Sequence, residues 1–151
     1  MTARGAAVVF GAGGGIGQAF VRALVSGGRY EAVYAGSRKG QSAILGARDF
    51  RFDLRDETSI AAAVEGIPEP LRLVIVATGT LHDVERGIAP EKSWRSLDAA
   101  VMADVLADNA IGPALIAKHC LPRFSRDDPC VFAALSARVG SIADNHLGGW
   151  H

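Results

Sequence analysis

The feature that most constrains the fold is a glycine-rich segment, residues 11–17, which joins an apolar run to an amphipathic stretch. The run before it, AAVVF over 6–10, has no polar alternation, which is typical of a strand buried on both faces. The stretch after it presents one apolar helical face, made of Ile16, Phe20, Leu24 and Val25. Gly27 and Gly28 then end the helix. A strand, a glycine turn and a helix in this order predict the first unit of a parallel α/β sheet.

The same alternation of strand and helix continues along the chain. Further strands are expected over 31–37, 49–53, 71–78 and 130–136. Asp56 is suited to cap a helix that ends near Gly66 and buries Ile60, Val64 and Ile67. A longer helix is expected over about 97–119, with an inward face of Leu97, Val101, Val105, Ile111 and Leu115. The pattern predicts one domain over 1–151, a Rossmann-type doubly wound parallel sheet in a three-layer αβα arrangement.

Composition excludes several classes of function. Lys plus Arg number 16 and Asp plus Glu number 16, so bulk charge favours neither nucleic acid nor an anionic membrane. No signal peptide precedes the first strand, and no apolar stretch approaches the length of a membrane span. Cys120 and Cys130 are too few for a disulfide framework or a zinc site. No metal-type partners accompany the histidines, which are His82, His119, His146 and His151. We expect a cytoplasmic protein with reduced thiols and no metal.

Each glycine of the loop has a physical task in binding a dinucleotide. A tight turn needs positive φ, a pyrophosphate approaches closely where there is no Cβ, and helix-on-strand packing favours the smallest residue. The phosphates then meet free N–H groups at the positive end of the helix. The spacing Gly11-x-Gly13-x-x-Ile16 lacks the last glycine of GxGxxG. The spacing Gly11-x-x-x-Gly15-Ile16-Gly17 fits GxxxGxG, which favours a dinucleotide site.

The residues at the end of the second expected strand indicate which dinucleotide the chain binds. NAD sites usually place an acidic residue there, to accept hydrogen bonds from the ribose 2′-hydroxyl. This chain has Ser37, Arg38 and Lys39 instead, a hydroxyl and two cations where a 2′-phosphate would lie. A guanidinium binds phosphate through charge-assisted, bidentate hydrogen bonds. The sequence therefore predicts NADP(H).

With these residues the chain resembles the short-chain dehydrogenases/reductases, in particular the branch of C-factor-like signalling proteins and small carbonyl reductases. FGAGGGIG over 10–17 is similar to the family's TGxxxGIG, with Phe10 in place of its threonine. The resemblance implies that Asp53, followed by Leu54, contacts the adenine. VATGTL over 76–81 stands where the family has NNAG, so that Ala77, Thr78 and Gly79 form the turn beneath the cofactor.

The resemblance also implies catalytic residues. Asn109, in DNAIGP, matches the helix asparagine of the family's catalytic tetrad. Pro113 has no N–H, so the Asn109 carbonyl four residues earlier loses its helical partner and needs water or a ligand. The family holds a relay water at this bend. The family's Ser-x-x-Gly pattern, counted back from Gly140, gives Ala137, so the catalytic serine is Ser136, which we favour because it ends a strand, or Ser141.

The proton donor of the family is a Tyr-x-x-x-Lys pair, in which the ammonium lowers the pKa of the phenol. In this branch the pair follows a DNxLGGW segment, which residues 144–150 match, and the chain ends at His151. The tyrosines are Tyr30 and Tyr34, and no lysine follows Lys118. We expect a chain that stops before the catalytic helix and carries the cofactor-binding part.

The resulting hypothesis is an NADP-dependent oxidoreductase that acts on a small carbonyl or alcohol substrate and forms a dimer or tetramer as a complete protein. The alternatives are an NADP(H)-binding or C-factor-like signalling protein without turnover, or an inactive truncation product. At this length we expect the strand over 130–136 to form an exposed sheet edge, and the chain to associate through that edge and the long helix.

Overall fold

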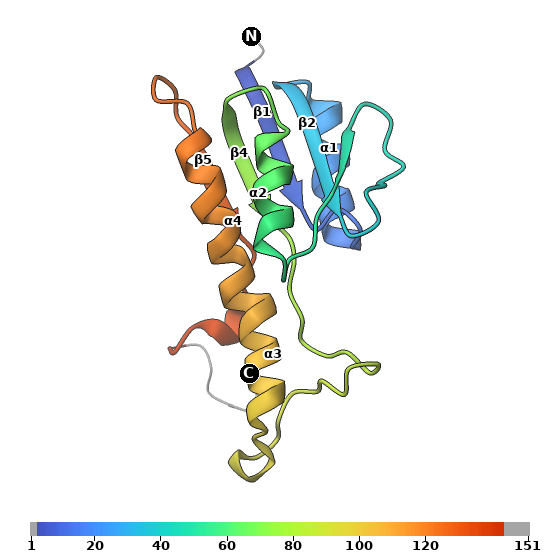
Figure 1. Cartoon of the computed structure of the whole chain (residues 1–151), viewed down its shortest axis with the longest axis vertical. Helices are drawn as coiled ribbons and strands as arrows, with labels where there is room; N and C mark the ends of the chain where they lie inside the picture. Colours follow the sequence, from blue (N-terminus) through green and yellow to red (C-terminus); the bar gives the residue numbers. More distant parts are fainter. Residues whose placement is uncertain (1–2, 144–151) are drawn as a thin grey trace.

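The computed structural model describes residues 3–143. Its centre is a five-stranded sheet in the order β3-β2-β1-β4-β5, with every neighbouring pair parallel (Figure 1). The strands are β1 Ala3–Phe10, β2 Tyr30–Ser37, β3 Arg48–Arg51, β4 Leu71–Val76 and β5 Val131–Ala134. The Rossmann sheet has the strand order 3-2-1-4-5-6, and the five strands described here follow its first five places. The predicted doubly wound parallel fold is confirmed.

Helices cover the two faces of the sheet. The α-helices are α1 Gly15–Gly27, α2 Glu57–Glu65, α3 Ala99–Leu106 and α4 Gly112–Cys120. Between α3 and α4 lies a π turn, η2 Ala107–Ile111, and short 3₁₀ turns occur at η1 Trp94–Ser96, η3 Leu121–Arg123 and η4 Arg138–Gly140. Helix α1 lies behind the sheet in Figure 1, whereas α2 and α4 lie in front of it. The three-layer arrangement follows from these positions.

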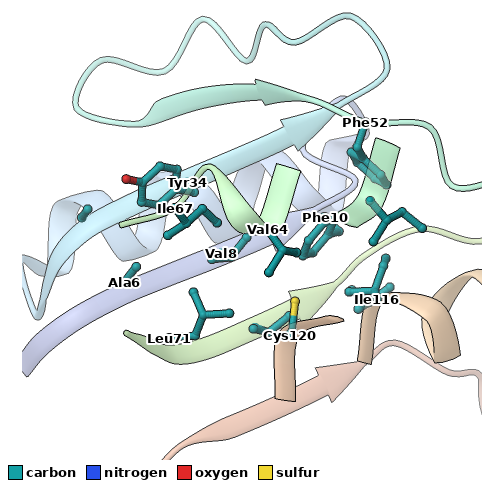
Figure 2. Close-up of a cluster of buried hydrophobic side chains, with 14 residues drawn as sticks. Ala6, Val8, Phe10, Tyr34, Phe52, Val64, Ile67, Leu71, Ile116 and Cys120 are labelled. Carbon is teal, nitrogen blue, oxygen red and sulfur yellow. The ribbon is translucent and has the colours of Figure 1, made fainter. Parts of the chain in front are cut away.

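The larger core lies between the sheet and helices α2 and α4. Phe10 is fully buried there and meets the ring of Phe52 edge-on, at a centroid distance of 5.0 Å (Figure 2). It also meets the ring of Phe50 edge-on, at 5.3 Å. Gly36 makes room for this cluster, because a Cβ at this position would lie 2.3 Å from the Phe50 ring. The helices contribute Ile60, Val64, Ile116 and Cys120. The helix cap at Asp56 is also confirmed, since its carboxylate accepts the Thr58 N–H at 3.0 Å.

The second core lies under α1, and it corrects one predicted residue. Val21 is fully buried against Val9 and Val33, with Phe20, Leu24 and Val25 partly buried around them. Ile16, predicted to belong to this face, is 63% exposed. It lies in the first turn of α1, where Gly17 is the buried residue because the helix comes close to the Gly11 carbonyl there.

The long helix predicted over 97–119 is interrupted by the π turn and begins two residues later than expected. Val105 is buried and Leu115 packs on the core, as predicted. Leu97 and Ile111 are 55% and 54% exposed, so the prediction that they lie on an inward face is wrong. Leu97 lies just before α3 and Ile111 at the end of η2, and Figure 1 shows that α3 extends beyond the end of the sheet.

By length and composition alone, the helical stretch Ala99–Arg123 is able to span a membrane. This corrects the expectation that no segment of the chain reaches that length. Its α4 half packs on the sheet, where Ile116 and Cys120 are fully buried. Its α3 half carries Asp104, which forms ion pairs with two arginines. The apolar character of α4 therefore serves the core of the domain.

Among the described residues, β5 is an edge of the sheet, as predicted for this strand. It is shorter than the predicted 130–136, although the Leu135 N–H still donates to the Val76 carbonyl at 3.0 Å. Phe132 packs on the core beside α4, whereas Val131, on the opposite face, is 53% exposed.

Candidate functional site

A cleft of about 920 Å³ opens at the carboxyl ends of the strands. This is the edge at which open α/β sheets bind their ligands. Its walls come from the segments that follow β1, β2, β3 and β4 and from the π turn. The predicted cofactor-binding residues that line it are Gly11, Gly13, Ser37, Arg38, Lys39, Asp53, Leu54, Ala77, Thr78 and Gly79. Gly15, Ile16 and Gly17 do not line the cleft and instead form the first turn of α1.

Two glycines of the loop are required by geometry. Gly11 has φ +97°, and a Cβ there would lie 2.8 Å from the Ala77 carbonyl carbon and oxygen. A Cβ on Gly17 would lie 2.2 Å from the Gly11 carbonyl oxygen. These contacts bring the start of α1 against the ends of β1 and β4. The predicted helix-on-strand packing is therefore found at Gly17.

The start of α1 has the properties of an anion site. Helix α1 follows Gly14, which gives its first turn no side-chain cap, and no acidic residue lies in that turn. Its free N–H groups and the positive end of the helix dipole therefore stay available. Gly13 and Gly14 line the cleft beside it, and a Cβ on Gly13 would touch no atom nearer than the Ser37 Cβ at 3.6 Å. A pyrophosphate fits this cradle.

The end of β2 supplies the hydroxyl and the two cations predicted there. Ser37 is buried, and its Oγ accepts the Gln41 N–H at 3.3 Å. Arg38 and Lys39 are exposed and line the cleft next to it. The chain then passes Gln41 and Ser42, which also line the cleft and were not predicted. Positive charge is therefore present one strand away from the glycine loop.

The segments after β3 and β4 complete the cleft. Asp53 is exposed and accepts the Arg55 N–H at 2.9 Å through Oδ1. Leu54 packs against helix α4, where a Cβ on Gly112 would lie 2.5 Å from the Leu54 Cγ. After β4, Ala77 donates its N–H to the Phe10 carbonyl at 2.8 Å. The Thr78 Oγ1 is buried and has no hydrogen-bond partner among the described residues.

Asn109 lies in the π turn, and its side chain binds the backbone after β4. Its Oδ1 accepts the Thr80 N–H at 2.8 Å and its Nδ2 donates to the Thr80 carbonyl at 2.7 Å. The π turn is closed by the Gly112 N–H, which donates to the Ala107 carbonyl five residues earlier. The bend predicted from Pro113 thus takes the form of a widened turn. Asn109 itself does not line the cleft.

The candidate serines lie beyond β5. Ser136 is exposed, and a Cβ on Gly140 would lie 3.3 Å from its Oγ. Ser141 follows the 3₁₀ turn η4 and donates its N–H to the Arg138 carbonyl at 3.0 Å. Neither serine lines the cleft. The segment predicted to lead to the Tyr-x-x-x-Lys position, residues 144–150, lies outside the described residues.

Both tyrosines of the chain lie away from the cleft. Tyr34 is buried in β2, where its hydroxyl donates to Glu69 Oε2 at 2.8 Å and accepts from Arg48 Nη1 at 2.8 Å. Burial raises the pKa of the Tyr34 phenol, although the hydrogen bond from Arg48 lowers it in part. Tyr30 begins β2, at the opposite end of the strand from Ser37. Neither is placed to donate a proton in the cleft.

A charged cluster that was not predicted from the sequence is centred on Asp108, which is 6% exposed and lines the cleft. Its carboxylate accepts from Arg55 Nε at 2.7 Å, Arg86 Nη1 at 2.8 Å and Thr80 Oγ1 at 2.8 Å. Burial alone would raise the pKa of this carboxyl, but the three hydrogen bonds outweigh it and lower the pKa to about 2. The carboxylate therefore stays ionised at neutral pH.

One sequence pattern could have indicated this cluster. Asp104 and Asp108 are four residues apart, a spacing that places two carboxylates on the same side of a helix. Two such acids, one of them buried, need cationic partners. Those partners, Arg55 and Arg86, come from the loops after β3 and β4, and their identity depended on the tertiary fold.

The remaining titratable candidates that the structure describes lie apart from the cleft cluster. Within residues 3–143, no group of three His, Cys, Asp or Glu side chains is placed to hold a metal ion. His119 Nε2 lies 3.0 Å from Glu57 Oε1, and burial raises the pKa of the free Cys120 thiol to about 12. His146 and His151 lie outside the described residues.

Comparison with known proteins identifies the fold. No family model matches the chain. No curated protein matches it either. Solved structures do match it. They include an NADPH-bound carbonyl reductase from chicken fatty liver, with 23% identity and TM-score 0.75, and a carbonyl reductase from Pseudomonas aeruginosa, with 22% identity and TM-score 0.75. A short-chain type dehydrogenase/reductase from Mycobacterium ulcerans matches with 20% identity and TM-score 0.69.

The three alignments cover 97%, 96% and 92% of this chain, and 62%, 67% and 54% of those structures, respectively. The chain therefore spans between half and two thirds of the length of these structures. Sheet order and cleft define a Rossmann-type α/β domain. More particularly, the fold is that of the short-chain dehydrogenases/reductases.

Proposed function

We propose that this protein is an NADP(H)-dependent oxidoreductase of the short-chain dehydrogenase/reductase family, and that residues 1–151 carry its cofactor-binding part. The observation that carries the proposal is one continuous cleft, lined by Gly13 and Gly14 beside the start of α1 and by Arg38 and Lys39 at the end of β2. The first pair suits a pyrophosphate and the second a 2′-phosphate. Among the structural neighbours, the carbonyl reductase from chicken fatty liver has NADPH bound.

The residues present fit such a cofactor. The uncapped helix α1 would hold the pyrophosphate, Arg38 and Lys39 the 2′-phosphate, and Asp53 the adenosine end of the molecule. The turn Ala77–Gly79 would lie under the nicotinamide half. When bound, NADPH would supply a hydride to a carbonyl, and NADP⁺ would accept one from an alcohol. The role of this chain is to bind and orient that group at the edge of the sheet.

For catalysis we propose the residues of this chain that the resemblance implies, which are Asn109 and either Ser136 or Ser141. Asn109 would act through its main-chain carbonyl, since its side chain is occupied by Thr80. Ser136 would hold the substrate oxygen, with Ser141 as the alternative. The substrate class is a small carbonyl or alcohol. The C-factor-like branch, the cytoplasmic location and a dimeric or tetrameric complete protein remain part of this proposal.

One alternative is an inactive truncation product, and a second candidate function is that of a protein that binds NADP(H) or acts in C-factor-like signalling without turnover. The observation that favours it is the position of Tyr34, whose hydroxyl is bound to Glu69 and Arg48 and not directed to the cleft. Both candidates require NADP(H) binding. They differ in carbonyl reduction, which an assay of the chain with generic aldehydes and NADPH distinguishes.

The proposed cofactor site is tested by titrating the protein with NADPH and following nicotinamide fluorescence. Gly13→Asp is the informative variant, because a Cβ at this position meets only the Ser37 Cβ at 3.6 Å. The variant should fold like the native chain, while its carboxylate would repel the phosphates. We expect saturable NADPH binding by the native chain and loss of binding by Gly13→Asp. An absence of binding by the folded native chain would contradict the proposal.

A further inference from the structure

Two arginines from different loops form one wall of the cleft. Arg55 follows β3 and Arg86 lies in the long segment after β4, and both line the cleft. They share two carboxylates. Arg55 binds Asp108 at 2.7 Å and Asp104 at 2.6 Å, while Arg86 binds Asp108 at 2.8 Å and Asp104 at 3.3 Å. The two guanidinium groups are therefore fixed side by side.

The charges of this wall are already paired with carboxylates. Two arginines face two aspartates, and Asp83 lies a further 3.8 Å from Arg86. All three guanidinium nitrogens of Arg55 have acceptors: Nε binds Asp108, Nη1 binds Asp104, and Nη2 donates to the Asp104 carbonyl at 3.0 Å. Such a group adds little attraction for a phosphate. A guanidinium whose nitrogens are bonded in its own plane can still stack its face on an aromatic ring.

The position of the two arginines indicates which ring of the dinucleotide would stack on them. The phosphate sites proposed above lie at the start of α1 and at the end of β2. Strand β3 pairs with β2, so the loop that carries Arg55 adjoins the adenosine side of the cleft. The side chains of Arg55 and Arg86 remain 39% and 32% exposed in the cleft, although their ends are held by the aspartates. Two partly exposed guanidinium groups, held by carboxylates, therefore line the cleft next to the proposed adenosine site.

We infer that Arg55 and Arg86 form a stacking surface for the purine ring of the dinucleotide, held in place by Asp104 and Asp108. This inference rests on the proposed NADP(H) function. Arg55 and Arg86 are binding residues, whereas Asp108 positions them. The surface selects for an aromatic base and is indifferent to the nicotinamide half of the cofactor.

The test uses adenosine 2′,5′-bisphosphate, which carries the purine and both phosphates, and inorganic pyrophosphate, which carries no base. The variant is the double substitution Arg55→Lys and Arg86→Lys, which keeps the positive charges beside Asp108 but removes the flat faces. Arg126→Lys, at an exposed arginine outside the cleft, is the matched control. Calorimetric titration gives the affinities, and thermal unfolding without ligand verifies that each variant folds.

For the double variant we expect the affinity for adenosine 2′,5′-bisphosphate to fall about tenfold, with unchanged affinity for pyrophosphate. The Arg126→Lys control should match the native chain. Equal affinity of the folded double variant and the native chain for adenosine 2′,5′-bisphosphate would overturn the inference, as would an equal loss for both probes. Failure of the native chain to bind NADPH would instead contradict the proposed function.

Discussion

Asn109 and Thr80 are joined through both ends of one side-chain amide: the Asn109 Oδ1 accepts the Thr80 N–H, and the Asn109 Nδ2 donates to the Thr80 carbonyl. The preceding residue, Asp108, holds the Thr80 hydroxyl at 2.8 Å. The π turn and the segment after β4 are thus fixed to each other at the centre of the sheet edge. The Asn109 side chain therefore holds the π turn against the segment after β4.

The contact between Asn109 and Thr80 predicts a stability effect. Asn109→Ala should lower the free energy of unfolding by about 1–2 kcal/mol, because it removes two hydrogen bonds and leaves the Thr80 backbone groups unpaired. Asn109→Asp keeps an acceptor for the Thr80 N–H but loses the donor. Its free energy of unfolding should lie between those of the native chain and Asn109→Ala. Urea unfolding followed by circular dichroism measures both. Unchanged stability of Asn109→Ala would show that the pair contributes nothing to the fold.

The glycine loop offers a matched pair of substitutions. Gly17→Ala should destabilise the protein by about 1–3 kcal/mol, the usual cost of overpacking, because its Cβ would lie 2.2 Å from the Gly11 carbonyl oxygen. At Gly15 a Cβ meets no atom within 4 Å, so Gly15→Ala should keep or raise stability through its better helix propensity. Thermal unfolding without ligand measures both variants. Similar unfolding midpoints for the two would contradict this account of the loop.

Because of Asp108, the free energy of unfolding should depend on pH in the acid range. Its pKa is lowered to about 2 in the folded protein, whereas an aspartate in an unfolded chain has a pKa of about 3.9. The unfolded chain therefore takes up this proton first as the pH falls. The stabilisation, roughly 2 kcal/mol, is fully present above the unfolded pKa and is lost as the pH falls through about 2.

Asp108→Asn should remove this acid-dependent part of the free energy of unfolding. The native chain should then lose roughly 2 kcal/mol more than Asp108→Asn between about pH 5 and pH 2. Asp127→Asn, at an exposed carboxylate, serves as the control and should follow the native profile. Parallel pH profiles for the native chain and Asp108→Asn would show that the ion pairs around Asp108 do not stabilise the fold.

Exposed apolar surface predicts association of the 151-residue chain. Leu106 on α3 is 54% exposed and Val131 on the edge strand β5 is 53% exposed. Apolar faces and unpaired strand edges recruit further chains. Light scattering should therefore give a mass above 15.8 kDa, and Leu106→Glu should reduce the association. A monodisperse monomer of 15.8 kDa would refute the prediction.

The sequence was most informative where local pattern and tertiary role coincide. Residues 6–10 of β1 and 73–76 of β4 are apolar without interruption because both faces of the sheet are covered there, so these runs indicate the place of the two strands in the sheet. The glycines at 11 and 17 were likewise predictable, since positive φ and close packing exclude other residues. At Ser37 and Arg38 the position at the end of a strand was sufficient to place them at the cleft.

The missed features depend on neighbours that a local pattern does not contain. Helical periodicity identified one face for Leu97 and Ile111 but could not show that α3 extends beyond the sheet. Arg55 is separated from Asp108 by 53 residues of sequence, so their pairing appeared only with the fold. The π turn follows from a missing N–H at Pro113, which predicts a bend but not its form.

The most direct test of the central claim is a paired titration of the native chain with NADPH and NADH, repeated with Arg38→Asp. Arg38 lies at the end of β2 in the cleft, where a guanidinium would bind a 2′-phosphate and a carboxylate would repel it. We predict that the native chain binds NADPH at least about tenfold more tightly than NADH, and that Arg38→Asp removes or reverses this preference. Equal affinities of the native chain for the two cofactors, or binding of neither, would contradict the account.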